Sequence, residues 1–143
     1  MNKWTRFSFL LAGLFAVSCN NNQVLADLSV QEVNDQIGGH VWTVDRFVDD
    51  DDNYTGFFSG WTFDFQENGT LVADNNGTQY NGSWYVEEDD DDRRGKELYL
   101  FFDNGPDQLQ DMEEDWYFDE LSNNRMSLYD PELVGRDELV FVK

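Results

Sequence analysis

His40 is the only histidine of the chain, so a catalytic site that uses imidazole as a base must be built on it. A Ser-His-Asp or Cys-His arrangement would also need a nucleophile beside it. His40 comes just before Trp42 at the start of a predicted strand, a position typical of a surface or barrel-end histidine. The acidic residues could supply a carboxylate pair for glycoside hydrolysis, but no spacing among them singles out a pair. We therefore expect no enzymatic activity.

Two acidic runs, Asp49–Asp52 and Glu88–Asp92, have the residue type that calcium prefers. Calcium takes about six to eight oxygen ligands, and loop carboxylates can supply them. Neither run has the spaced oxygens, the glycine and the terminal glutamate of an EF-hand loop. Since runs of like charge are usually solvated, we predict no metal site and no cofactor, the alternative being calcium binding by these acidic loops.

The charge balance excludes one class of partner. The chain has 9 Lys and Arg against 30 Asp and Glu, a net charge of −21. Such a surface repels the phosphate backbone of nucleic acids, and the sequence has no basic patch to bind it. Aromatic residues make up 16% of the chain and recur at the spacing of strands, unlike a disordered acidic tract. We expect a folded domain with an acidic surface and no nucleic-acid partner.

The first residues have the features of a secretory signal. Lys3 and Arg6 precede an apolar run over residues 7–17. This run has the length of a signal-peptide core and is too short to span a bilayer. We therefore assign residues 1–18 to a signal peptide.

The segment Ala-Val-Ser-Cys at 16–19 resembles the bacterial lipobox, in which small residues precede a cysteine that is acylated on sulfur. Cys19 is the only cysteine, and a polar tether, 19–27, begins with it. The resemblance implies a mature lipoprotein of 125 residues (143 minus 18), anchored to a membrane by lipid without spanning it. Asn20 is not the aspartate that retains many lipoproteins at the inner membrane, so the resemblance favours the outer membrane of the cell envelope. It names neither the face nor a protein partner.

Beyond the tether, the hydrophobic pattern predicts one short helix followed by strands. Four apolar residues between Leu28 and Ile37 fall close to helical spacing, and Gly38-Gly39 ends the pattern. Apolar and polar residues then alternate in eight runs separated by turn residues such as Asn-Gly. The predicted strands are 40–48, 57–65, 70–74, 78–87 and 98–102, then shorter ones around Trp116 and Phe118, around Met126 and Leu128, and around Leu139 and Phe141.

The short links between these strands favour an antiparallel meander over a parallel sheet with helical crossovers. About eight strands suffice to close an up-and-down barrel, whose interior holds side chains or one small ligand. We therefore predict an all-β fold for residues 28–143: an antiparallel up-and-down eight-stranded barrel with one short N-terminal helix. Gly82, inside a predicted strand, suggests a bulge or a tight bend.

The order of these elements resembles the lipocalin-like domains of bacterial lipoproteins. The likeness rests on Gly-His-Val-Trp at 39–42, the hairpin segment 63–71, Gly-Ser-Trp at 82–84, and the closing segment with Leu128 and residues 137–141. In lipocalins, a Gly-x-Trp element closes one end of the barrel, and an arginine near the last strand packs over the tryptophan. Here two residues separate the glycine from Trp42. The resemblance makes Arg136 the candidate for the covering cation–π contact, the alternative being a solvated side chain.

Seven aromatic side chains are predicted to face inward and form the candidate ligand-binding set: Trp42, Phe63, Phe65, Tyr80, Trp84, Trp116 and Phe118. The rings either fill the barrel or line a cavity for an apolar ligand. The sequence therefore predicts a membrane-anchored lipocalin-like lipoprotein that binds a small apolar ligand at the cell envelope. The alternative is a non-catalytic interaction or structural module with a filled barrel. The interior volume distinguishes the two.

Overall fold

The computed structural model describes residues 25–89, 95–130 and 136–143. The predicted signal peptide, Cys19 and the tether up to residue 24 lie outside the described residues. The helical elements are η1 (Leu25–Asp27), α1 (Val30–Ile37) and α2 (Asp107–Gln110), and the strands are β1 (His40–Asp49), β2 (Asp52–Asn53), β3 (Trp61–Phe65), β4 (Thr70–Asn75), β5 (Thr78–Glu88), β6 (Lys96–Phe102), β7 (Asp115–Leu121), β8 (Arg125–Asp130) and β9 (Asp137–Val142). None of the helices in these ranges is long and apolar enough to cross a membrane.

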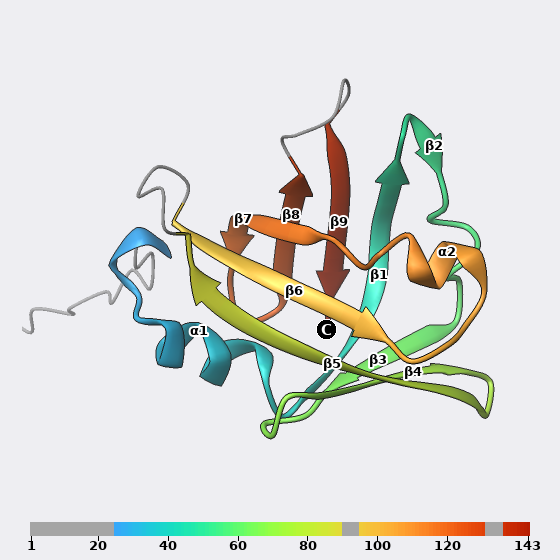
Figure 1. The fold of residues 1–143 in the computed structure, drawn as a ribbon, viewed down its shortest axis with the longest axis horizontal. Coiled ribbons are helices and arrows are strands. Elements are labelled where there is room, and N and C mark those ends of the chain that lie inside the picture. Colours follow the sequence, from blue (N-terminus) through green and yellow to red (C-terminus); the bar gives the residue numbers. More distant parts are fainter. Residues whose placement is uncertain (1–24, 90–94, 131–135) are drawn as a thin grey trace, which may run out of the picture.

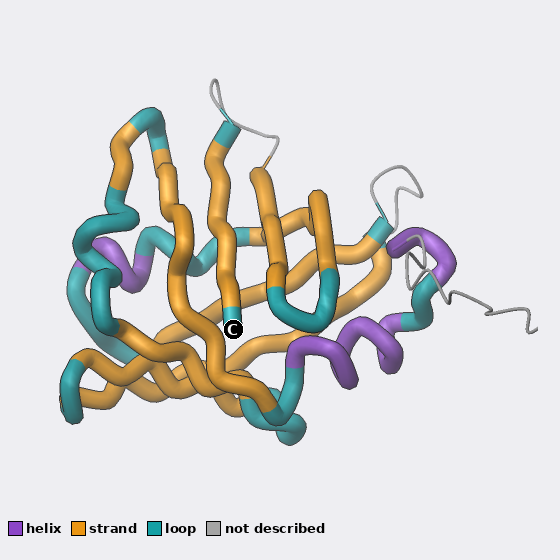
Figure 2. Tube along the Cα trace, turned by 180° about the vertical axis from the view of Figure 1, so that it is seen from behind, coloured by secondary structure: helices purple, strands orange, loops and turns teal. Residues whose placement is uncertain are grey.

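The strands form a closed antiparallel barrel (Figures 1 and 2). From β3 onward each strand pairs with the next along the chain, and β1 pairs with both β3 and β9, which closes the sheet. The two-residue β2 pairs only with the end of β1 and adds a short flap outside the eight-stranded circuit. The predicted architecture, an eight-stranded antiparallel barrel with a short N-terminal helix, is therefore confirmed.

Turn chemistry sets the register of the hairpins. Between β4 and β5, Asn76 and Gly77 have φ values of 50° and 96°, and Asn75 pairs with Thr78. Two consecutive residues with positive φ give the tight turn whose twist matches that of two antiparallel strands. The signal for this hairpin was legible in the sequence, because asparagine and glycine are the residues that tolerate these angles.

The helix α1 packs against β5 toward one end of the barrel (Figure 1). It begins with a capping box, in which the Ser29 side chain accepts from the Glu32 N–H and the Glu32 carboxylate accepts from the Ser29 N–H. This exchange satisfies two backbone donors that a helix start leaves unpaired. Val33 and Ile37 are buried, so the helix contributes its apolar face to the core.

A bulge in β1 changes which residues face inward. The pairing of β1 with β9 shifts register between Val44 and Arg46. Trp42 and Phe47 are both fully buried although they are an odd number of positions apart, which strict alternation forbids. Beyond the bulge, Asp49 therefore shares the inward face of Phe47. The sequence pattern did not predict this bulge.

Other details also differ from the predicted elements. β3 begins at Trp61, and residues 57–60 form turns in which Phe58 is buried. The sequence prediction missed β2 and α2. At Gly82 neither ladder shifts register, so there is no bulge. The glycine is required by close approach instead, since a Cβ there would lie 2.0 Å from the Phe101 carbonyl oxygen.

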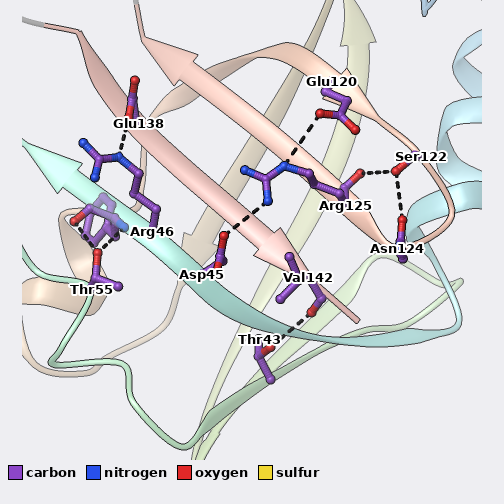
Figure 3. A network of polar contacts seen from close by, with 11 residues as sticks. Thr43, Asp45, Arg46, Thr55, Glu120, Ser122, Asn124, Arg125, Glu138 and Val142 are labelled. Carbon is purple, nitrogen blue, oxygen red and sulfur yellow. Dashed lines mark hydrogen bonds and ion pairs between the residues drawn. The ribbon is translucent and has the colours of Figure 1, made fainter.

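The outer face of β1, β8 and β9 is polar (Figure 3). Arg46 pairs with Glu138, and Arg125 lies between Asp45 at 3.2 Å and Glu120 at 3.6 Å. These side chains are about half exposed, so water screens each pair and each contributes little to stability. They mark the solvated side of strands whose other side is apolar.

Candidate functional site

The seven aromatic side chains of the predicted set contribute to the core of the barrel. Trp42, Phe63, Phe65, Trp84, Trp116 and Phe118 are at most 7% exposed, and Tyr80 is half-buried at the edge of the core. The Tyr80 ring stacks on Trp61, with centroids 5.6 Å apart and an interplanar angle of 11°. Their positions agree with the predicted alternation. A ligand-binding role for these residues stays a prediction.

The interior rings are one another's packing partners. The Phe141 ring lies edge-on to Phe63 at 5.3 Å and to Phe65 at 5.6 Å, and Phe65 also meets Trp84 at 5.6 Å. Trp116 meets Phe47 at 6.3 Å. These separations are those of aromatic rings in contact, so the rings occupy the interior as a hydrophobic core does.

The indole N–H groups of three interior tryptophans already donate hydrogen bonds to backbone carbonyls. The indole N–H of Trp42 donates to the Ile37 carbonyl at 3.2 Å, and that of Trp116 donates to the Met112 carbonyl at 2.9 Å. Trp84 donates to the Gln66 carbonyl at 3.0 Å. A ligand in the barrel would have to compete with these backbone acceptors for the three indole donors.

The cation over Trp42 is Lys143, not Arg136. The Lys143 ammonium lies 4.4 Å from the centre of the Trp42 ring, whereas the Arg136 guanidinium lies 4.5 Å from the Tyr129 ring and pairs with Asp119. The assignment of Arg136 to Trp42 was therefore wrong. Arg136 lies just before the start of β9 and Lys143 just after its end, so only the lysine reaches the barrel end that holds Trp42.

A groove of about 550 Å³ lies outside the barrel, between α1 and the β3–β4 hairpin. Gln31, Asn34, Asp35 and Glu67 line it together with Trp84 and Tyr85. The Asn34 side-chain oxygen is buried there and accepts no hydrogen bond from the described residues. With amides and carboxylates on its walls, this groove does not fit the apolar ligand that the sequence suggested.

At the other end of the barrel, the inward-facing positions next to the last buried apolar residues are occupied by acids. Asp49 follows Phe47 by two positions, Asp130 follows Leu128, and Asp137 and Glu114 come two positions before the buried Leu139 and Trp116. Side chains two apart in a strand share a face, so Asp49, Asp130 and Asp137 are placed toward the barrel axis, and Glu114, just before β7, lies beside Asp49 and Asp137. The ends of β1, β8 and β9 that carry three of them lie side by side at the top of Figure 1.

Three of these groups, Asp49, Glu114 and Asp137, form what we call the acidic cluster. One carboxylate oxygen from each lies within 4.8 Å of the others. Asp137 is 1% exposed; its Oδ1 accepts from the Asp50 N–H at 3.0 Å, but its Oδ2 has no hydrogen-bond partner among the described residues. Glu114 Oε2 is also buried and unpaired. Buried carboxylate oxygens without donors are costly, because their hydration has been lost without replacement.

Proton affinities in the acidic cluster are raised. Burial raises the pKa of Glu114 to about 8, with further contributions from the charges of Asp130, Asp49 and Asp137 and a hydrogen bond with Asp130. Burial, followed by repulsion from Asp137 and other aspartates, raises the pKa of Asp49 to about 6. The pKa of Asp137 is also raised, mainly by burial, although the Asp50 N–H opposes the shift. Burial and repulsion from neighbouring acids both disfavour the charged form of a carboxylate.

No basic side chain neutralises the acidic cluster within the described residues. The ion pairs among the described residues join acids outside the cluster to Arg46, Arg125, Arg136 and Lys96. A cavity of about 250 Å³ that is open to solvent adjoins the cluster, with Glu114 and Asp130 among its lining residues. The site is thus negative, partly desolvated and accessible.

The sequence analysis missed this grouping because it considered acidic runs. Of the run Asp49–Asp52, only Asp49 belongs to the cluster, and the run Glu88–Asp92 lies partly outside the described residues. The sequence did contain a signal for the cluster. If the alternating pattern of a strand is continued by one more inward-facing position, that position holds an acid where an apolar residue is expected. His40 lies exposed on β1, far along the strand from Asp49.

Comparisons with protein-family models, with curated proteins and with solved structures find no match to this chain.

Proposed function

We propose that this protein is a lipid-anchored, non-catalytic module of the bacterial cell envelope, whose barrel is a solid support and whose outer surface carries its interactions. The observation that supports this proposal is the mutual packing of the interior rings. Six of the seven candidate ligand-binding rings are at most 7% exposed, and those of Phe63, Phe65, Trp84 and Trp116 contact other core rings.

The packing favours this function over binding of an apolar ligand inside the barrel. Sites for small molecules typically offer about 300–1,000 Å³ of space lined by apolar groups and a few polar ones. Among the described residues, a groove of that size lies outside the barrel and has polar walls. The contacts of the module would be made by the outer surface, where Tyr85 and Phe101 are 52% and 53% exposed.

The anchoring part of the proposal rests on the sequence alone. Residues 7–17 and the lipobox-like segment at 16–19 predict acylation of Cys19. Two or three acyl chains hold a domain stably at a membrane, where one alone does not. Replacing Cys19 with serine should release the protein from the membrane fraction without altering its fold.

Native mass spectrometry of the protein extracted from bacterial membranes tests both parts. We expect the mass of the chain from Cys19 onward plus its acyl chains, and no further molecule released on denaturation. Acyl chains remain attached when the protein unfolds, so they are distinguished from a bound ligand. A small molecule present at one per chain and lost on unfolding would contradict the filled barrel. An unacylated chain, or one that begins at another residue, would contradict the anchor.

A further inference from the structure

The acidic cluster contains negative charge that the described residues do not compensate. Asp49, Glu114 and Asp137 come from three separate parts of the chain, so their proximity is a product of the fold and not of a local run of acids. Asp137 is 1% exposed, and among the described residues neither its Oδ2 nor Glu114 Oε2 has a hydrogen-bond partner. A buried carboxylate oxygen of this kind requires a cation or a proton.

The ligand set indicates which cation. All the donors are oxygens, which suit calcium and magnesium and not the softer transition metals. Calcium takes oxygen ligands at about 2.4 Å, so two ligands on opposite sides of one ion are at most about 4.8 Å apart. The three carboxylate oxygens lie within this distance of one another. Magnesium requires ligands at about 2.0–2.1 Å in a near-ideal octahedron, whereas the flexible coordination of calcium suits carboxylates that come from three separate parts of the chain.

We propose that Asp49, Glu114 and Asp137 bind one calcium ion at the end of the barrel formed by β1, β8 and β9. Three carboxylates provide up to six oxygens, and water entering through the adjoining cavity completes the coordination shell. Asp130, which lines the same cavity as Glu114, places a further carboxyl group beside the site. The ion joins the end of β1 to the start of β9, so binding stabilises the seam at which the barrel closes.

The alternative occupant is a proton shared between carboxyl groups. Calcium and protons compete for the same oxygens, but only calcium binding saturates with metal concentration at fixed pH and fixed ionic strength. This difference makes the two explanations separable. The proposal does not depend on the lipid anchor or on the outer surface, so its failure would leave the proposed function intact.

The test is a calcium titration of the full 143-residue chain, stripped of metal with a chelator and studied at about pH 8 and constant ionic strength. Calorimetry gives the stoichiometry. Terbium luminescence gives a second readout, because the buried Trp116 is two residues from Glu114 and can sensitise a bound lanthanide. The variants are Asp137→Asn and Glu114→Gln. Asp103→Asn, an exposed acid outside the cluster, is the control matched in charge.

We expect one calcium ion per chain, displacement of terbium by calcium, and affinity lowered by about 10- to 100-fold or more in each cluster variant. Asp103→Asn should stay within about twofold of wild type. Absence of saturable binding, or equal weakening by Asp103→Asn, would overturn the proposal. If Asp137→Asn fails to fold by circular dichroism, Glu114→Gln alone decides. Displacement of terbium by magnesium at the same concentration as calcium would overturn the choice of calcium.

Discussion

The two ends of this barrel solve the problem of closure in opposite ways. At the end near α1, the Trp42 ring is covered by polar groups: its indole N–H donates to the Ile37 carbonyl, and Lys143 lies over its face. At the other end the apolar columns finish in carboxylates, and two of their buried oxygens have no donor among the described residues. The buried oxygen beside α1 that has no partner in the described ranges belongs to the neutral amide of Asn34, whereas those at the other end belong to carboxylates, which a bound cation or proton would stabilise. In the described part of the chain, the two ends therefore differ in buried carboxylate groups without donors, and this difference marks the acidic cluster as the candidate site.

The largest effect on stability is expected at the barrel end near α1. Trp42→Ala removes a fully buried ring together with its hydrogen bond, and should lower the free energy of unfolding by about 3–5 kcal/mol in urea titrations. Phe101→Ala, which truncates a ring that is 53% exposed, is the control and should cost less than about 1 kcal/mol. Equal losses in the two variants would mean that the interior is not close-packed, and the contrast between the ends would disappear.

The second effect is a pH dependence of the free energy of unfolding, which arises from the acidic cluster. The pKa values of Asp49, about 6, and Glu114, about 8, lie above their ordinary values, so the folded chain binds protons more tightly than the unfolded chain. Stability from these groups is complete below about pH 4 and is lost as the pH rises through 6 to 8. The groups that face them are Asp50, Asp52, Asp111, Asp130 and Asp137.

In metal-free protein we expect the free energy of unfolding to fall by about 2 kcal/mol between pH 5 and 8.5, after allowance for partial exposure of these carboxyls. Saturating calcium should flatten this slope, because the ion replaces the protons. Chemical denaturation across this pH range, with and without calcium, measures both curves. Stability that rises with pH in the metal-free protein would contradict the assignment.

A smaller gain is expected from Glu114→Gln. The substitution removes a partly desolvated charge from the acidic cluster, so metal-free protein at pH 8 should become more stable by about 1–2 kcal/mol. The same variant should no longer be stabilised by calcium. Thermal melts with chelator and with calcium provide the comparison. Destabilisation in chelator would indicate that Glu114 serves the packing of the fold and not a cation.

The smallest effect concerns the cation over Trp42. Lys143→Met should lower the free energy of unfolding by about 0.5–1 kcal/mol, since the ammonium contacts the ring at an exposed position. A double-mutant cycle with Trp42→Leu isolates the contact. We expect coupling of similar size for Lys143, whereas Arg136→Met and Trp42→Leu should be additive. Coupling to Arg136 instead would restore the lipocalin-like assignment.

Much of the fold was predictable because it depends on local signals. Alternating apolar residues and the Asn-Gly turns determine the strands, and eight strands with short links close a barrel. The bulge at Val44–Arg46 was not predictable, because it follows from pairing with β9 at the far end of the chain. For the same reason Lys143 was overlooked, since only the completed barrel brings it to Trp42.

The candidate site was predictable in part. The inward orientation of the rings follows from alternation, but whether they leave a cavity depends on three-dimensional packing such as that of Phe141 against Phe63 and Phe65. The acidic cluster draws on residues 65 positions and 23 positions apart along the chain (114 minus 49, and 137 minus 114). These residues are brought together only in the folded barrel, where the ends of neighbouring strands lie side by side.

A crystal structure of the full chain grown with terbium or calcium tests the central contrast between the two ends most directly. The account predicts one anomalous peak in contact with the carboxylates of Asp49, Glu114 and Asp137, and a barrel interior occupied by side chains alone. Absence of metal at the acidic cluster, together with density for a small molecule among the interior rings, would contradict it.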